Sequence, residues 1–294
     1  MILKYIVKEN KYQSINQILK QEFKISARLQ HKLITSKQIF LNGNQADSRI
    51  APQINDVITV NLDFNEESEN IIPTQMALNI VYEDEALLIL DKPAGIAVHP
   101  SILHYTDSLA NGVKYYFDTI GLKRKIRPVN RLDLNTSGLI VFAKNEYVQE
   151  CLIQQMQTNK FKKEYLAIVH GIFEKTQGTI TLPIARKENS IIERCISENG
   201  QEAITHYEVL KTSNDLSLVH CTLQTGRTHQ IRVHMSAIGH SLVGDTLYGS
   251  DFSDSITRQA LHSYKISFIH PISHQIVSFT SELPDDIKSS IEAI

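Results

Sequence analysis

The sequence predicts an α+β protein with two unequal domains. A small N-terminal α/β domain precedes a larger one with a mixed, largely antiparallel β-sheet and flanking helices. The length of 294 residues is about twice that of a typical domain. A polar, acidic segment follows residue 62. Beyond it, strand-like apolar runs and helical patterns alternate irregularly, which favours an α+β fold over a doubly wound one.

The first domain, residues 1–62, is predicted to contain two short helices and then a turn-rich β segment. Ser14 and Ser26 are each placed to cap a helix. Asn42 and Gly43 form a typical two-residue hairpin turn. Residues 63–74 are predicted to be an acidic linker, and residues 75–294 the second domain.

In the second domain we expect four strands and one helix. The helix is expected to begin with Thr225 or Thr228 as its cap and to end at Gly239. The five segments are Ala86–Leu90, Leu139–Ala143, Glu164–His170 and Leu216–Leu223 as strands, and Thr228–Ile238 as the helix.

Composition and charge restrict the functional classes. The hydrophobic share of 42% is that of an ordinary globular protein. Three scattered cysteines disfavour a disulfide framework and fit a reducing compartment. No apolar run approaches the length of a membrane span, and no signal-peptide stretch follows Met1. We therefore expect a cytoplasmic protein without a membrane partner.

The charge is unevenly distributed along the chain. Residues 1–60 hold nine basic and four acidic side chains, a net charge of +5, whereas the remainder has a net charge of −7. A basic head on an acidic body indicates a module that binds polyanions. Two further basic clusters, Lys123–Arg131 and Lys160–Lys163, are expected either to flank an RNA site or to be solvated surface.

Three motifs carry candidate chemistry. Residues 130–138 place a lone aspartate, Asp133, in a polar turn before an apolar strand. Residues 224–235 run through a glycine turn into a helix, with Arg227 where the helix is expected to start. A strand beside the second basic cluster carries Tyr165. Taken alone, each also fits a plain structural role: an Asx-turn, a surface arginine on a capped helix, and a packed tyrosine.

The motifs do not predict a metal or nucleotide site. His229 and His234 are five residues apart, which separates them by ~140° on a helix and disfavours a zinc pair. No glycine-rich phosphate loop of the dinucleotide or nucleoside-triphosphate type is found in the sequence.

Together with residues 91–100, the three motifs resemble the RluA-type pseudouridine synthases in order and spacing, over about residues 75–285. The strings Arg-Leu-Asp-x-x-Thr-Ser-Gly and Gly-Arg-Thr-His-Gln-Ile-Arg are the most specific part. The first domain resembles the alpha-L RNA-binding domain; a small capping domain without an RNA role is the alternative. One departure is Asn130, where the family usually has histidine.

The resemblance implies an isomerase that converts uridine in RNA to pseudouridine. The basic domain and linker are similar to the branch that modifies large-subunit ribosomal RNA, with transfer RNA as the alternative. The reaction needs no cofactor and no metal, and we expect a monomer. Two rivals are a non-catalytic RNA-binding or ribosome-assembly factor, and a glycosidase or nucleosidase, which usually needs two carboxylates.

The resemblance also implies roles for residues. Asp133 is the essential carboxylate, as nucleophile or as base. Arg227 pairs with it, Tyr165 stacks on the uracil, and Arg131 takes the place of the extruded nucleotide. Further residues expected to contact or orient the RNA are Asn130, Lys163, Thr136, Ser137, His229 and Gln230 at the site, and Arg28 and Lys32 on the second helix of the first domain.

Overall fold

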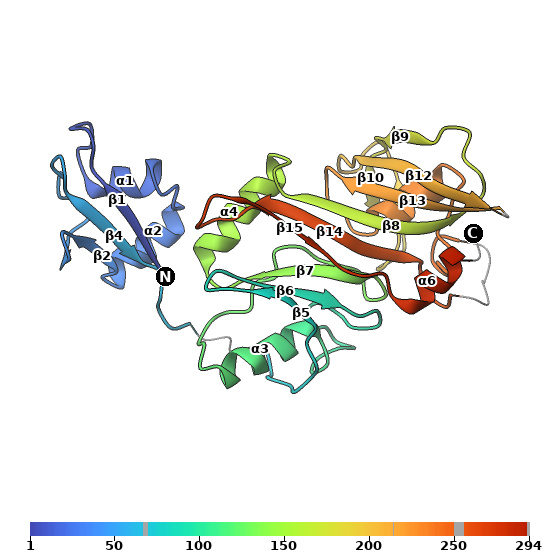
Figure 1. Cartoon of the computed structure of the whole chain (residues 1–294), viewed down its shortest axis with the longest axis horizontal. Helices are drawn as coiled ribbons and strands as arrows, with labels where there is room; N and C mark the ends of the chain where they lie inside the picture. Colours follow the sequence, from blue (N-terminus) through green and yellow to red (C-terminus); the bar gives the residue numbers. More distant parts are fainter. Residues whose placement is uncertain (67–69, 214, 250–255, 293–294) are drawn as a thin grey trace.

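A computed structural model describes residues 1–66, 70–213, 215–249 and 256–292. The described chain is elongated, with a small N-terminal unit at one end and a large sheet in the remainder (Figure 1). Residues 67–69, inside the predicted linker, lie outside the described residues. Among the residues described, no helix is long and apolar enough to cross a membrane.

The N-terminal unit is an antiparallel sheet of four strands in the order β1-β4-β2-β3, with two helices. Asn42 and Gly43 both have positive φ, 51° and 83°, which confirms the hairpin turn. Ser26 accepts a hydrogen bond from the Leu29 amide, whereas the Ser14 side chain makes no capping bond. The elements are β1 (Ile2–Ile6), α1 (Ile15–Gln21), α2 (Ala27–Thr35), β2 (Ile39–Leu41), β3 (Asn44–Gln45) and β4 (Val57–Asn61).

The large sheet has nine strands, in the order β5-β6-β7-β14-β8-β13-β12-β9 with β15 added to β14. Every pair is antiparallel except β7 and β14, which confirms a mixed, largely antiparallel sheet. The strands are β5 (Ile80–Glu83), β6 (Leu87–Lys92), β7 (Ser137–Ala143), β8 (Lys162–His170), β9 (Gln177–Ile180), β12 (Thr205–Ser213), β13 (Leu216–Leu223), β14 (Leu261–Ile269) and β15 (Ile276–Thr280).

Four helices and a small two-stranded sheet complete the second part of the chain. They are α3 (Leu109–Thr119), α4 (Glu146–Gln157), α5 (Gln230–Ala237) and α6 (Asp285–Glu292), with β10 (Ile184–Arg186) paired to β11 (Arg194–Ile196). All four predicted strands are present as β6, β7, β8 and β13. Strand β8 is apolar on both faces: Tyr165 and Ala167 belong to one core cluster, and Leu166 and Ile168 to another.

Helix α5 differs from its prediction at the N-terminus. It begins at Gln230, and its N-cap is His229, with φ of 58° and no capping bond from a side chain. Neither Thr225 nor Thr228 caps it, so that prediction is wrong; the Thr225 hydroxyl instead donates to the Gln230 side-chain oxygen at 2.8 Å. Gly239 follows with φ of 88°, as expected for a glycine that ends a helix.

Two arginines of the first basic cluster, Arg124 and Arg127, are paired with acidic side chains of the segment that follows residue 62. Arg124 forms an ion pair with Asp63, and Arg127 donates to both carboxylate oxygens of Glu66 at 2.6 and 2.8 Å. Both arginines are buried. The expectation that this cluster contacts RNA is therefore wrong for Arg124 and Arg127, because this segment already supplies their counter-charges.

Candidate active site

A cavity of about 840 Å³ lies where the three motifs meet. Its lining contains four lysine or arginine side chains but, within the described chain, one carboxylate, Asp133. This positive lining contrasts with the net charge of −2 for the whole chain. The predicted site residues that line the cavity are Asn130, Arg131, Asp133, Thr136, Lys163, Tyr165, Arg227, His229 and Gln230.

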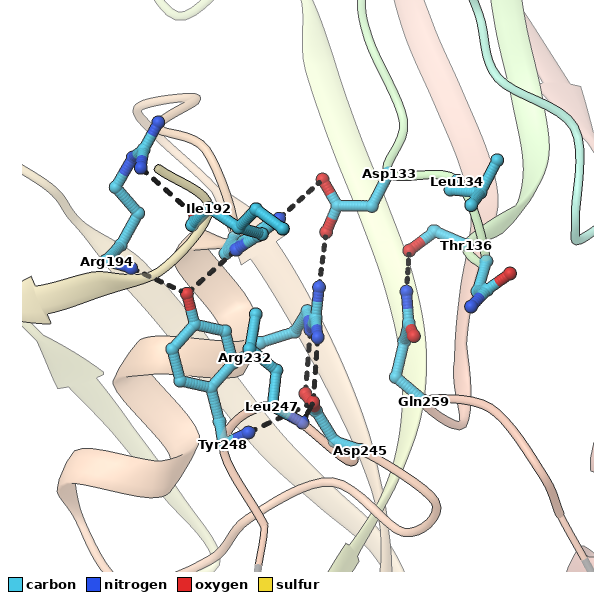
Figure 2. Close-up of polar contacts among 12 residues, drawn as sticks. Asp133, Leu134, Thr136, Ile192, Arg194, Arg232, Asp245, Leu247, Tyr248 and Gln259 are labelled. Carbon is cyan, nitrogen blue, oxygen red and sulfur yellow. Dashed lines mark hydrogen bonds and ion pairs between the residues drawn. The ribbon is translucent and has the colours of Figure 1, made fainter. Parts of the chain in front are cut away.

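The loop that carries Asp133 is fixed from several sides. The Thr136 amide donates to the Asp133 carbonyl at 3.1 Å and closes the turn. The Thr136 hydroxyl accepts from Gln259 at 3.3 Å (Figure 2). Arg258 donates to the Asn135 carbonyl at 3.0 Å. These bonds hold the loop, and with it the Asp133 side chain, in one orientation.

A fully buried lysine ties this loop to β6. The Lys92 ammonium donates to the carbonyls of Pro93, Ile96 and Leu134 at 2.8 to 2.9 Å. Burial, with the nearby charge of Arg258, lowers the pKa of Lys92 to about 7. Lys92 thus joins two loops at the cavity through their backbones.

The guanidinium beside Asp133 belongs to Arg232, on α5. Its Nη1 atom lies 3.4 Å from Oδ2 of Asp133, and its other nitrogens donate to the two oxygens of Asp245 at 2.7 Å each (Figure 2). Arg227 instead donates from Nε to the Glu202 carbonyl at 2.8 Å. The prediction that Arg227 pairs with Asp133 is therefore wrong.

Asp245 makes Arg232 a fixed cation. Burial on its own would lower the pKa of Arg232, but the hydrogen bonds and charge of Asp245 raise it above its ordinary value. A guanidinium held in this way fixes the direction of the Asp133 carboxylate. Asp245 has no exposed side-chain surface. It lies within residues 75–285, over which the sequence resembles the RluA-type family, but no residue pattern in the sequence had marked it as functional.

His229 supports the other side of Asp133. Its Nε2 atom lies 3.9 Å from Oδ1 of Asp133, and its Nδ1 atom is 2.8 Å from the Tyr248 hydroxyl. Burial lowers the pKa of His229 in spite of the Asp133 charge. The left-handed backbone of His229 is uncommon for a side chain other than glycine, and such strain is often retained at functional sites.

Tyr165 lies on β8 and faces the same cavity. Its side chain is buried, and burial raises the pKa of its phenol well above the ordinary value, with the Asp133 charge acting in the same direction. The phenol is therefore neutral at physiological pH. A flat neutral ring at this position can stack on a base.

Three side chains that were predicted to contact RNA form hydrogen bonds within the protein: Asn130, Gln230 and Ser137. The Asn130 amide donates to the Leu139 carbonyl at 3.1 Å, and its oxygen accepts from the Val141 amide at 2.9 Å. The Gln230 side chain accepts from the Arg227 amide at 2.9 Å. Ser137 is buried and does not line the cavity. These side chains hold the walls of the site in position.

The two predicted residues of the first domain do not line the cavity. The Arg28 side chain is 86% exposed and lies 3.5 Å from Glu146. The Lys32 ammonium lies 2.6 Å from Glu66 and 3.6 Å from Glu146. Over the described ranges, no group of three or more metal-ligating side chains could hold an ion.

Residues 86–237 match a family model described as RNA pseudouridylate synthase. The chain belongs to this family. A Bacillus subtilis relative named as an uncharacterized RNA pseudouridine synthase is 38% identical over 86% of this chain and 89% of its own length. A Zymomonas mobilis relative named ribosomal large subunit pseudouridine synthase D is 39% identical over 79% and 77%. Both similarities extend well beyond the motifs.

A solved structure, human RNA pseudouridylate synthase domain containing 1, is similar with a TM-score of 0.59 and 28% identity, over 71% of this chain and 84% of that chain. The RluA-type resemblance is confirmed, and the protein is an isomerase that acts on uridine in RNA. Membership of this family therefore favours the isomerase over the two rival functions, a glycosidase or nucleosidase and a non-catalytic RNA-binding factor.

Proposed function

We propose that this enzyme converts one or more uridines of large-subunit ribosomal RNA to pseudouridine, and that Asp133 performs the chemistry. The observation that carries the role of Asp133 is its isolation: it is the one carboxylate among the described residues of a positive cavity, and Arg232 holds it. Relatives named ribosomal large subunit pseudouridine synthase D, 38 to 40% identical, support the choice of RNA.

The chemistry requires one base to leave the RNA stack. Arg131 is exposed at the cavity and has no side-chain partner within the described parts of the chain, so it is free to fill the vacated place. The bond between N1 of uracil and C1′ of ribose breaks, the base rotates and C5 bonds to C1′. The proton on C5 then leaves to water, and N1 takes up a proton, so that the product is an isomer of uridine. Asp133 either attacks C1′ or removes a ribose proton, and both routes require its ionised form.

The first experiment uses RNA labelled with tritium at C5 of uracil, because that hydrogen is released to water only when C5 forms the new bond. We expect release by the wild type and by Asp118→Asn, an aspartate on α3 outside the cavity, but none by Asp133→Asn. Large-subunit ribosomal RNA and transfer RNA are tested separately. Release from transfer RNA alone would contradict the choice of ribosomal RNA as substrate. Release by Asp133→Asn equal to that of the wild type would contradict the role of Asp133.

We also propose that the enzyme acts as a monomer in the cytoplasm. The basic N-terminal domain supplies an RNA-binding module within the same chain, so a second copy is not needed for RNA affinity. Light scattering at micromolar concentration should give the mass of one 33.4 kDa chain. A mass of twice that value would contradict this part of the proposal.

A further inference from the structure

Lys163 differs from the other buried cations because, among the residues that the structure describes, its charge has no protein partner. Its side chain is buried, with 8% of the residue exposed, and it lines the active-site cavity. In the described parts of the chain, no carboxylate, carbonyl or hydroxyl accepts a hydrogen bond from its ammonium. The buried ammonium of Lys92, by comparison, donates to three carbonyls. An unpaired buried charge costs free energy, so a ligand is the natural source of the missing partner.

The surroundings of Lys163 are positive. A Cβ atom at Gly226 would come within 2.9 Å of its Nζ atom, so the ammonium lies against the turn that precedes α5. Arg227, the next residue of that turn, also lines the cavity. Burial, together with the charge of Arg227, lowers the pKa of Lys163 to about 8. Asp133 does not neutralise the pair, because its oxygens lie beside Arg232 and His229.

We propose that Lys163 and Arg227 form a subsite for one backbone phosphate of the RNA strand, beside the target uridine. This inference rests on the proposed function, since the ligand is the RNA that enters the cavity. A phosphate carries a full negative charge and can accept from a lysine point charge and an arginine fork together. A uracil carbonyl carries only a partial charge, so it would not neutralise most of the repulsion between Lys163 and Arg227.

The phosphate subsite fixes the position of the RNA strand relative to Tyr165. Lys163 and Tyr165 are two positions apart on β8 and both face the cavity, so their backbone positions are ~7 Å apart along this β-strand. Phosphate contacts position a nucleic acid, while contacts with the base select it. The subsite would therefore hold the backbone while the extruded base reaches Tyr165. It also gives Arg227 a positioning role in place of the predicted pairing with Asp133.

The test compares three variants on large-subunit ribosomal RNA. Lys163→Met removes the charge and keeps an apolar chain of similar length, Lys163→Arg keeps the charge, and Lys211→Met removes an exposed lysine of β12 outside the cavity. We measure kcat and KM from tritium release, and the slope of log Kd against log salt concentration from direct RNA binding. Circular dichroism confirms that each variant is folded.

We expect Lys163→Met to raise KM about tenfold and to reduce the salt slope by ~0.7, the value for one phosphate of a single strand. The kcat at saturating RNA should change less than threefold. Lys163→Arg and Lys211→Met should keep the wild-type slope. Because Lys163 loses its charge above its pKa of about 8, kcat/KM of the wild type should fall above that pH, and this fall should be absent in Lys163→Arg.

The outcomes separate the two claims. No tritium release by the wild type contradicts the proposed function. Release by the wild type together with an unchanged salt slope in Lys163→Met contradicts the phosphate subsite alone. A folded Lys163→Met variant that loses kcat but keeps its slope would likewise overturn the subsite, because it would assign Lys163 to the shape of the cavity rather than to the RNA backbone.

Discussion

At the scale of single residues, the site depends on which of two arginines meets Asp133. Arg232 bridges Asp133 and the buried Asp245 in two directions, which a lysine cannot do. We expect Arg232→Lys to reduce kcat about a hundredfold, the usual effect of losing one fixed donor at a reacting group. Arg227→Lys should keep kcat within about fivefold of the wild-type value. Steady-state kinetics of the two variants shows which arginine is the partner of Asp133.

The lysine in Arg232→Lys still offers a charge to Asp245, so the variant should remain folded; a thermal melt checks this. If Arg227→Lys loses as much kcat as Arg232→Lys, the assignment of the partner of Asp133 is wrong.

The sequence identified the motif of residues 224–235 but not which of its arginines contacts Asp133. Arg227 and Arg232 belong to one conspicuous string, and the expected start of the helix suggested the first. The chain takes a left-handed turn at His229 before α5 begins, which moves the start of the helix. Which side chain then meets Asp133 depends on how α5 packs beside the loop before β7. That packing joins residues about a hundred positions apart, and local patterns contain no information about it.

Asn130 should tolerate the family's histidine. Its side chain donates to Leu139 and accepts from Val141, both on β7. A neutral imidazole also has one donor and one acceptor nitrogen, so Asn130→His should keep turnover within about tenfold of the wild type. Asn130→Leu has neither and leaves two buried backbone groups unpaired, so it should lower the free energy of unfolding by ~2 kcal/mol or more. Equal stability of the two variants would refute this role.

At the scale of elements, the parallel pair of β7 and β14 positions the Asp133 loop. Gly138 has φ of 109°, and a Cβ there would collide with the Ser263 backbone, whose nitrogen would be 2.7 Å away. Gly138→Ala should therefore lower the free energy of unfolding by about 3 kcal/mol. Gly121 also has positive φ, but a Cβ added there would meet no neighbouring atom within 4 Å. Gly121→Ala should cost about 1 kcal/mol. Urea unfolding measures both, and equal losses would show that strain, not the collision, dominates at Gly138.

Strands were predictable where burial on both faces makes an apolar run. The run 139–143 falls inside β7, which is buried at every position. The strand-like segment 216–223 matches β13 over its whole length, although Ser217, His220 and Thr222 interrupt its apolar side chains. Strand β12 has no such run because its burial alternates and most of its side chains are polar. Strand β1 is short and interrupted by Lys4. Edge and half-exposed strands acquire their structure from pairing partners distant in sequence, and so composition alone did not indicate them.

At the scale of the whole molecule, the N-terminal unit is attached to the second domain by a network of polar contacts. Glu66 accepts from Lys32 of α2 and from Arg127, and Ser26 at the start of α2 donates to Glu150 of α4 at 2.6 Å. The bonds from Lys32 and Arg127 hold the pKa of Glu66 below its ordinary value against the opposing effect of burial. Lys32 is therefore a structural link between the domains, although its charge and helix position indicated an RNA contact.

Arg28 and Lys32 should consequently respond differently to the same substitution. Arg28 is 86% exposed and can reach a phosphate. Arg28→Met should therefore reduce the slope of log Kd against log salt concentration by ~0.7 to 0.9, the effect of losing one phosphate contact, and leave the shape unchanged. Lys32→Met removes the charge that joins α2 to Glu66. It should increase the radius of gyration in small-angle scattering, because the N-terminal unit is less firmly held, while the salt slope stays near that of the wild type. The opposite pattern, with a reduced slope in Lys32→Met and an unchanged radius, would make Lys32 the RNA contact that its sequence position first suggested.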